Sequence, residues 1–382
     1  MSNAPAPSKG LADVIVADTV KSKVDGQNGR LYYLGYRIED LAENATFEEV
    51  AYLLLNNRLP NKSELEAFTA SIANQAAVEP DVINIMKQLP KNAHPMAVLQ
   101  AVVAILGMLD PEAASSTPEA NMNKAVRLIA KTPTVVAAWA RIREGLEPVA
   151  PRTDLGLAAN FVYMFKDRQP TETEIDAINV YLVLLADHGF NASTFTSRVV
   201  TGTDADVHSA VASAIGALKG PKHGGANEAA MKMFFEIGEP ENVENWFKSE
   251  VKEKGRKIMG IGHRVYKAPD PRAAILKVRA KALAESSGNR KWYDIAEKLE
   301  SLARADEYFQ ERALYANVDY YSSIVLYTIG IEPDMMTPLF AMSRMAGWTA
   351  HIMEQWADNR LIRPKANYVG EIDKPWVPLS DR

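Results

Sequence analysis

Apolar and polar positions alternate at helical spacing along most of the chain. The clearest run covers 175–187, where the sequence YLVLL at 181–185 leaves almost no polar face. A helix that is apolar nearly all round is typical of the buried middle of a large helical domain. The pattern therefore predicts an all-α fold built around this segment.

Start signals separate the other predicted helices. Three Ser/Thr-x-x-Glu sequences have the spacing of a helix capping box, at 46–49, 63–66 and 171–174. Further helices are expected over 94–109, 118–130, 134–144, 207–218 and 228–235. We expect short connections between them, marked by proline and glycine.

Only the N-terminal segment has a pattern that favours strands. Two short runs, at 14–16 and 31–33, flank a turn region that contains Asp25, Gly26 and Gly29. We expect short strands or extended segments here and no large sheet.

The pattern changes twice in the C-terminal half. Charged, amphipathic helices are predicted over 241–254, 272–285 and 290–308, as in an outer layer or a smaller second domain. From Pro333 the chain becomes apolar again at helical spacing, which favours core or a subunit contact. Residues 363–382 contain three prolines and are expected to be extended.

Composition narrows the class of protein. Of the 382 residues 47% are hydrophobic, which supplies a large core, and the net charge of -5 argues against nucleic-acid binding as the main function. There is no cysteine, so disulfides, thiolate metal sites and cysteine nucleophiles are excluded. No apolar run is long enough to span a bilayer. We expect a cytoplasmic protein whose residues 1–10 form a short flexible leader.

Candidate chemistry starts at the sequence GPKHGGAN, residues 220–227, which lies between two predicted helices. Proline ends the first helix, and the two glycines after His223 permit close approach of another group. A neutral imidazole held there is suited to donate a hydrogen bond to a developing negative charge. On its own the sequence also fits a structural histidine in a turn.

Two more histidines stand beside glycine. His188 follows the buried helix and precedes Gly189, where it serves equally well as a helix C-terminal cap. His263 follows Gly260 and Gly262 and is followed by basic residues, a combination that suits phosphate or carboxylate groups. The alternative is an ordinary glycine turn with a solvated basic face.

Asp319 lies among valine and tyrosines in the sequence NVDYYSS. An apolar setting would raise its pKa and make it a better proton acceptor, although aspartate is also common at helix N-termini.

The six histidines lack metal-binding spacing, and no nucleophile elbow, P-loop or dinucleotide fingerprint is present. Two histidines and one aspartate without metal or nucleophile suggest acid–base chemistry on carbon.

Together and in this order, these segments resemble the citrate synthase family. The matching sequences are GPxHGGAN at 220–227, GxGHRVY with DPR within 260–272, NVDYYS at 317–322, SRMAGWxAH at 343–351 and RPK at 363–365. Residues 10–42 also resemble the family's N-terminal signature. The resemblance covers almost the whole chain and implies a large helical domain, 1–220 and 330–382, with a smaller helical domain, 221–329, inserted in it.

The resemblance implies catalytic roles for three residues. His223 matches the histidine that stabilises the enol or enolate of acetyl-CoA, and Asp319 matches the base that removes a methyl proton. His263 matches the histidine that binds and protonates the oxaloacetate carbonyl. No cofactor or metal is implied.

It also implies substrate-binding groups and a partner. Oxaloacetate carboxylates are expected to be held by His188, Arg272, Arg344 and Arg363. The last of these would come from the second subunit of a simple homodimer. The expected CoA-binding residues are Lys257, Ile258, Met259, Gly260, Lys267 and Asn317.

Two departures and two alternatives accompany the resemblance. Leu34 stands where the family often has arginine, and Ser323 replaces a common glycine. The related 2-methylcitrate synthases use propionyl-CoA, which differs by one methyl group, a difference worth about 1–3 kcal/mol in a pocket. Both acyl donors remain open. A catalytically silent dimeric scaffold of the same fold is a third interpretation.

Overall fold

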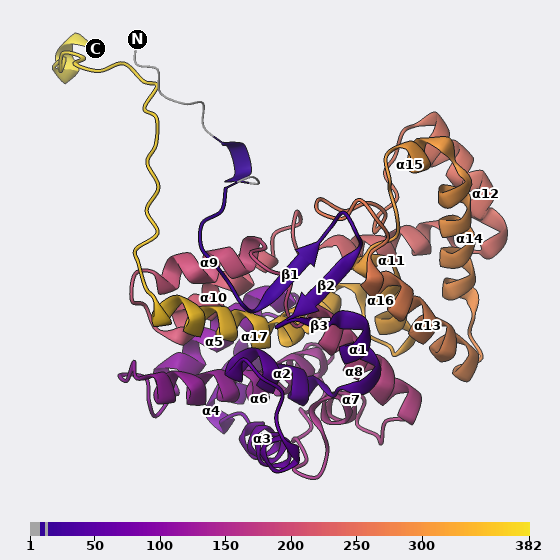
Figure 1. Cartoon of the computed structure of the whole chain (residues 1–382), viewed down its shortest axis with the longest axis horizontal. Helices are drawn as coiled ribbons and strands as arrows, with labels where there is room; N and C mark the ends of the chain where they lie inside the picture. Colours follow the sequence, from indigo (N-terminus) through magenta and orange to yellow (C-terminus); the bar gives the residue numbers. More distant parts are fainter. Residues whose placement is uncertain (1–7, 12–13) are drawn as a thin grey trace.

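The computed structural model describes residues 8–11 and 14–382, and the expected leader at 1–10 falls largely outside this part. The structure is helical almost throughout (Figure 1). In chain order its α-helices are α1 (Ile38–Asn44), α2 (Phe47–Asn56), α3 (Lys62–Gln75), α4 (Pro80–Gln88), α5 (Pro95–Leu109), α6 (Pro118–Arg143), α7 (Leu157–Lys166), α8 (Glu172–Leu185), α9 (Ala192–Thr201), α10 (Val207–Leu218), α11 (Ala226–Ile237), α12 (Val243–Trp246), α13 (Pro271–Ser286), α14 (Lys291–Ala305), α15 (Glu307–Glu311), α16 (Val318–Thr328) and α17 (Pro333–Ala357).

The strands form one small antiparallel sheet in the order β1 (Ser22–Asp25), β2 (Arg30–Tyr33) and β3 (Tyr36–Arg37). The expectation of short strands or extended segments is confirmed, because 31–33 lies in β2 and 14–16 forms no paired strand. That segment is extended without strand pairing, and Ile15 is 90% exposed. Its apolar pattern lacks a neighbouring strand, and an unpaired strand has no ladder hydrogen bonds.

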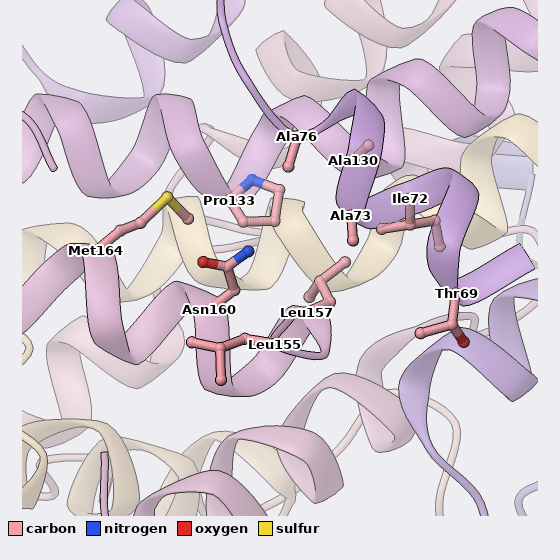
Figure 2. Close-up of a pocket in the computed structure, with 10 residues that line it drawn as sticks. All are labelled: Thr69, Ile72, Ala73, Ala76, Ala130, Pro133, Leu155, Leu157, Asn160 and Met164. Atoms are coloured by element: carbon pink, nitrogen blue, oxygen red, sulfur yellow. The ribbon is translucent and has the colours of Figure 1, made fainter. Parts of the chain in front are cut away.

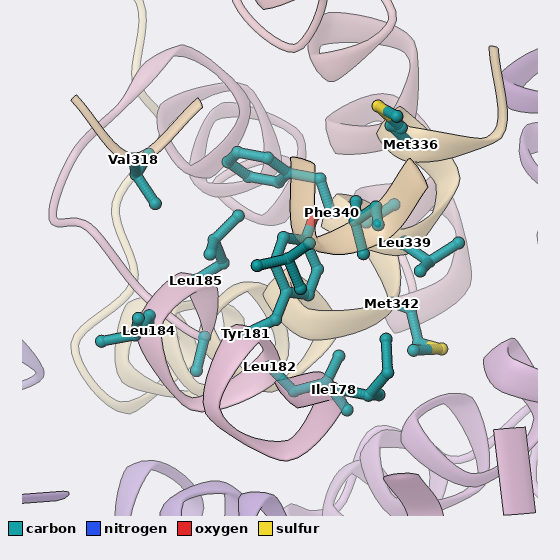
Figure 3. Packing of buried hydrophobic residues seen from close by; sticks show 14 of the residues in the cluster. Ile178, Tyr181, Leu182, Leu184, Leu185, Val318, Met336, Leu339, Phe340 and Met342 are labelled. Carbon is teal, nitrogen blue, oxygen red and sulfur yellow. The ribbon is translucent and has the colours of Figure 1, made fainter. Parts of the chain in front are cut away.

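The core lies where α8 meets α17. Tyr181 and Leu185 of α8 lie near Phe340 of α17 (Figure 3), and Leu182 and Leu339 belong to the same buried cluster. These side chains are at most 7% exposed. The prediction of a buried central helix is confirmed, because α8 has neighbours on nearly every side, among them α7, α13 and α17.

The helix starts follow local hydrogen-bonding signals, but one predicted start and one predicted break differ from the structure. The capping box of Thr171 and Glu174 forms as predicted. The helix expected to open at Ser63 instead begins after Asn61, whose side chain accepts from the backbone N–H of Glu64. Asparagine is as strong an N-cap as serine, so the earlier residue takes the role.

The predicted break between 130 and 134 is also wrong, because α6 runs through Pro133 without interruption. Proline in a helix interior costs about 3 kcal/mol. Both flanks of Pro133 are buried against α17 and neighbouring helices, and this packing outweighs the cost.

Figure 1 shows two groups of helices. Helices α11 to α16 gather on one side, and α1 to α10 with α17 form the rest of the body. The sheet lies between them, and the turn of its β1–β2 hairpin contacts the segment after His263. There the N–H of Lys267 donates to the carbonyl oxygen of Gly26 at 2.8 Å. The hairpin thus braces a loop that carries candidate chemistry.

The last residues leave the body as an extended segment (Figure 1). Residues 363–382 are exposed throughout. Across the described residues, no helix combines the length and apolar character that crossing a membrane requires.

Candidate active site

His223 lies in a tight turn between α10 and α11. The N–H of Gly224 donates to the carbonyl oxygens of Leu218 at 3.0 Å and Gly220 at 3.2 Å. A Cβ at position 224 would run into the Leu218 carbonyl oxygen and would lie 2.8 Å from a methyl carbon of Thr337. Glycine is therefore required here for close packing, and this packing fixes the loop that presents His223.

The hydrogen bonds of His223 define its tautomer. Ser193 donates its backbone N–H to Nε2 of His223 at 3.2 Å, and its hydroxyl lies 2.8 Å from the same nitrogen. Nε2 is therefore an acceptor, and the proton of the neutral ring belongs on Nδ1. Burial, and then the charge of Arg344, lower the pKa of His223 to about 4. The ring is neutral at physiological pH, with Nδ1–H available as a donor.

His263 is held in the opposite tautomer. The backbone N–H groups of Val265 and Tyr266 both donate to its Nδ1, at 3.0 and 3.1 Å. The proton of the neutral ring therefore belongs on Nε2. Burial, followed by the charge of Arg272, lowers the pKa of His263 to about 4. His263 thus offers Nε2–H to a ligand.

His188 packs directly against this group. Its ring lies 5.6 Å from that of His263, and its Nε2 is 3.3 Å from the Tyr266 hydroxyl. Burial, then Arg272 and His263, lower its pKa well below the ordinary value. The residue does not cap α8, because Ala186 occupies that position. A third neutral imidazole therefore faces the same region.

Two buried arginines supply positive charge. The Arg272 guanidinium is bound by Asp270 through Nε at 3.0 Å and Nη2 at 2.8 Å. Arg344, on α17, is only 1% exposed and donates Nε–H to the Leu185 carbonyl oxygen at 2.7 Å. Its buried Nη1 has no hydrogen-bond partner among the described residues. An unpaired buried donor is costly, and a ligand carboxylate would satisfy it.

Asp319 lies in the first turn of α16, whose N-cap is Asn317. The Asn317 side chain accepts from the N–H of Asp319 at 2.9 Å, so Asp319 itself is not the cap. Burial raises the pKa of Asp319 to about 6, against the opposing charges of Arg272 and Arg344. A carboxylate with this pKa is a stronger base than aspartate in water.

Shared electrostatic effects connect these groups. The charge of Arg344 lowers the pKa of His188, His223 and Asp319, and Arg272 lowers that of His188, His263 and Asp319. The structure therefore brings together a carboxylate base, neutral imidazole donors and two guanidinium groups. Such a site can remove a proton from carbon, stabilise the resulting oxyanion and hold an anionic ligand.

The expected CoA-binding residues fall on the loops before and after His263 and at the start of α16. Gly260 has φ 80°, and a Cβ there would lie 2.8 Å from Cα of Tyr320, so the 257–260 loop packs closely on α16. Asn317 donates to the Gly262 carbonyl oxygen at 2.7 Å, which ties the loop to the start of α16. Ile258 is buried, Met259 is half-buried, and Lys257 and Lys267 are exposed.

Arg363 is the one predicted site residue that lies apart. It is exposed on the extended C-terminal segment and has no hydrogen bond or ion pair with other described residues. Leu34 lies in the β2–β3 turn, where its φ is 47°.

Sequence reasoning assigned no role to Ser193, Tyr266, Asp270 or Trp348. Trp348 donates its indole N–H to the Ser193 hydroxyl at 3.1 Å, which places it behind His223. Ser193 and His223 are 30 residues apart, so their pairing has no sequence signal. Asp270 is different, because an aspartate two residues before an arginine at a helix start is a recognisable N-cap.

A pocket elsewhere in the protein carries no comparable chemistry. It lies between α3, α6 and α7 and is lined mainly by apolar side chains such as Ile72, Leu157 and Met164 (Figure 2). The Asn160 amide is already bound to the backbone of Arg152. In residues 8–11 and 14–382, no three His, Asp or Glu side chains are arranged to hold a metal ion.

The fold and these groups fit an enzyme that performs acid–base chemistry on a carbon acid beside groups that can bind carboxylates. A sequence profile of the family described as "Citrate synthase, C-terminal domain" matches residues 10–365. The chain belongs to the citrate synthase family, a family of acyltransferases.

Three known proteins illustrate the similarity. "Citrate synthase 2" of Bacillus subtilis is 49% identical over 377 residues, which is 98% of this chain and 99% of that one. "2-methylcitrate synthase" of Mycobacterium tuberculosis is 42% identical over 96% and 91% of the two chains. A citrate synthase from the archaeon Thermoplasma acidophilum, solved as a ternary complex with carboxymethyl coenzyme A and oxaloacetate, superimposes with a TM-score of 0.93 at 36% identity over 99% and 100% of the chains.

Proposed function

We propose that this protein condenses acetyl-CoA with oxaloacetate and water to give citrate and CoA. The observation that carries the proposal is the opposite direction of the pKa shifts within one site. Asp319 has a raised pKa, whereas His223 and His263 are kept neutral and are held in defined tautomers. One base and two neutral donors are groups that condensation at a thioester methyl group can use.

In the first step, Asp319 takes a proton from the acetyl methyl group. The thioester proton is weakly acidic, so charge must be stabilised on the carbonyl oxygen as the proton leaves. His223 donates its Nδ1–H to that oxygen, because Nε2 is occupied by Ser193. A positioned acid or base of this kind contributes about 10²–10⁴-fold to the rate.

In the second step, the enolic carbon attacks the ketone carbon of oxaloacetate and forms the new carbon–carbon bond. His263 donates its Nε2 proton to the ketone oxygen, which becomes the hydroxyl of the citryl thioester. Water then breaks the carbon–sulfur bond and releases CoA as a free thiol. The first two steps use proton transfer and hydrogen bonding by Asp319, His223 and His263.

The oxaloacetate carboxylates are held by His188, Arg272 and Arg344. The unpaired Nη1 of Arg344 supports this assignment, since it is a buried donor without an acceptor. For the acyl donor, residues 257–260 and Asn317 form the wall next to Asp319, and the exposed Lys267 is placed to meet a CoA phosphate. The bound ligands of the similar archaeal enzyme belong to the same two chemical classes.

We further propose that residues 221–329 act as a smaller domain that closes over the substrates. The site is divided between the two groups of helices, because His263, Arg272 and Asp319 lie on one and His188 and Arg344 on the other. Closure would exclude water until oxaloacetate is bound.

We also propose a homodimer in which Arg363 of one subunit completes the oxaloacetate site of the other. Two features support it. Arg363 is exposed and has no hydrogen bond or ion pair with other described residues of its own chain. The tail also exposes large apolar residues, among them Trp376 at 77% and Val369 at 89%, which a partner subunit would cover.

The 42% identity to a 2-methylcitrate synthase keeps propionyl-CoA as a second candidate acyl donor. The experiment measures CoA thiol release with oxaloacetate, in parallel with acetyl-CoA and propionyl-CoA. Higher kcat/KM on acetyl-CoA supports the proposal, and higher kcat/KM on propionyl-CoA replaces it with 2-methylcitrate synthesis. No thiol from either substrate would leave the inactive scaffold as the interpretation.

A further inference from the structure

One face of α17 holds the segment that follows α8. Positions 344, 347, 348 and 351 lie on this face, since residues three and four apart are neighbours on a helix. Arg344 binds the Leu185 carbonyl oxygen, and Trp348 binds the Ser193 hydroxyl. Between them Gly347 has no side chain, and a Cβ there would lie 2.6 Å from an Asp187 carboxylate oxygen.

The fourth position, His351, pairs with Asp187. Its Nε2 lies 3.3 Å from the Asp187 carboxylate, and both side chains are 0% exposed. The carboxylate also accepts the Ser22 hydroxyl proton and the N–H of Gly189 at 3.2 Å. Asp187 therefore joins three parts of the chain: β1, the turn that carries His188, and α17.

Neither residue takes part in the chemistry proposed above, yet burying an ion pair is expensive. Such a pair often contributes less to stability than apolar residues of the same volume would. Its position gives it a different use, because Asp187 precedes His188 directly and His351 lies two turns beyond Arg344. The pair therefore ties together the two elements that carry oxaloacetate ligands.

We propose that Asp187 and His351 are positioning residues that hold His188 and Arg344 in the geometry required to bind the oxaloacetate carboxylates. The inference rests on the proposed function and deepens it. Asp187 and His351 would affect the binding of oxaloacetate and not of CoA, because neither residue contacts the groups assigned to CoA.

Charged groups of both signs face the pair. Asp187 faces His351 and Arg344, while His351 also faces Glu354, its Nδ1 lying 3.6 Å from that carboxylate. Arg198 of α9 binds Glu354 at 2.7 Å and lies 3.2 Å from His351 Nδ1, and buried Lys21 adds positive charge near Asp187 and Glu354. Burial and the charge of Arg198 oppose protonation of His351, but Asp187 and Glu354 outweigh them and raise its pKa.

The test compares His351→Ala with His351→Gln in the full-length enzyme. Alanine removes the donor to Asp187, whereas the glutamine amide can still donate to it. We expect kcat/KM for oxaloacetate to fall about 10- to 100-fold in the alanine variant, the scale of a small misplacement of substrate-binding groups. The KM for acetyl-CoA should stay within about twofold, and glutamine should restore most of the oxaloacetate loss.

His208→Ala is the matched control. His208 is another buried histidine, 4% exposed and 3.7 Å from the Asp110 carboxylate, but it lies at the far end of α10 from His223. This variant should lose thermal stability without changing the oxaloacetate KM. Calorimetric titration with oxaloacetate alone measures the dissociation constant of oxaloacetate directly in all variants.

Two outcomes overturn the inference while the proposed function stands. One is an active His351→Ala variant with unchanged oxaloacetate binding. The other is an equal loss for both substrates that glutamine does not restore, which would indicate a general structural role. If the His351→Ala variant does not fold, the His351→Gln variant decides. A glutamine variant whose KM for oxaloacetate and KM for acetyl-CoA rise by the same factor contradicts the proposal. Failure of the proposed function is distinct, since the wild-type protein would then release no thiol.

Discussion

Ser193 donates its backbone N–H to Nε2 of His223 at 3.2 Å, and its hydroxyl lies 2.8 Å from the same atom. The hydroxyl in turn accepts the indole N–H of Trp348. This arrangement leaves only Nδ1 of His223 to carry a proton toward a ligand. The orientation of the proposed enol-stabilising group thus depends on a residue from another helix, and its removal tests that dependence.

Ser193→Ala should lower kcat about 10- to 100-fold, because the His223 ring loses one of its two contacts and Trp348 loses its acceptor. The KM for oxaloacetate should change little. Steady-state kinetics with acetyl-CoA measure both. Ser197→Ala is the control, since its buried hydroxyl on the same helix bonds only to the Thr194 carbonyl oxygen. Equal losses in the two variants would show that the Ser193–His223 contact has no special role.

Asp319→Asn should abolish condensation and yet stabilise the protein. Burial shifts the Asp319 pKa from its ordinary 3.8 to about 6, so the native state disfavours the carboxylate. At about 1.4 kcal/mol per pKa unit the cost at pH 7 is roughly 2–3 kcal/mol. Asparagine carries no charge and therefore removes this cost of burying the carboxylate. The gain should be full above pH 6 and should vanish below pH 3.8, where the carboxyl is protonated in both folded and unfolded states.

Denaturant unfolding of Asp319→Asn and wild type at pH 7.5 and pH 3.5 measures this difference. An asparagine variant that is less stable at both values would mean that Asp319 is favourably solvated or paired in the native protein. Retained turnover would remove Asp319 from its assigned role as the base.

Activity should have one acidic limb. Asp319 must be ionised to accept a proton, so kcat/KM for acetyl-CoA should fall about tenfold per pH unit below pH 6. The pKa values of His223 and His263 are near 4, so both rings stay neutral between pH 6 and 8 and add no loss of activity there. A pH–rate profile with a limb near 7 would instead point to an imidazole as the titrating group.

Gly347→Ala should destabilise the protein by about 1–3 kcal/mol, the usual cost of overpacking a core. The new methyl group would meet the fixed backbone carbonyl of Ala186. Gly216→Ala is the matched control, another glycine inside a helix, whose added methyl meets only the end of the Gln100 side chain. That substitution should change stability by less than about 1 kcal/mol, since alanine also favours the helix. Thermal and denaturant unfolding distinguish them, and equal effects would refute the packing argument.

Arg363 should act across a subunit boundary. An Arg363→Ala variant and an Asp319→Ala variant should each be nearly inactive alone, because each lacks one essential group. When subunits exchange, a mixed dimer contains one site with both residues intact, so part of the activity returns. Thiol release after mixing, with exchange followed by mass spectrometry, measures this. Proven exchange without recovery would contradict a shared site.

Local sequence patterns predicted much of the fold. The capping box at Thr171, the buried helix α8 and the extent of α10 all follow from residues close to each other in the chain. Errors arose where distant packing opposed a local rule. Pro133 lies inside a continuous helix because its surroundings are buried.

The identities of the chemical groups were also present in the sequence. Glycine beside histidine, and aspartate among aromatic residues, marked His188, His223, His263 and Asp319, because these combinations are local. The sequence by itself therefore determined the helical class, the family resemblance and the residue types of the site. Tertiary structure alone decided which imidazole nitrogen carries the proton, which arginine nitrogen lacks a partner and that Asp187 meets His351. Those properties depend on burial and on contacts between segments as far as 164 residues apart, and no local pattern records them.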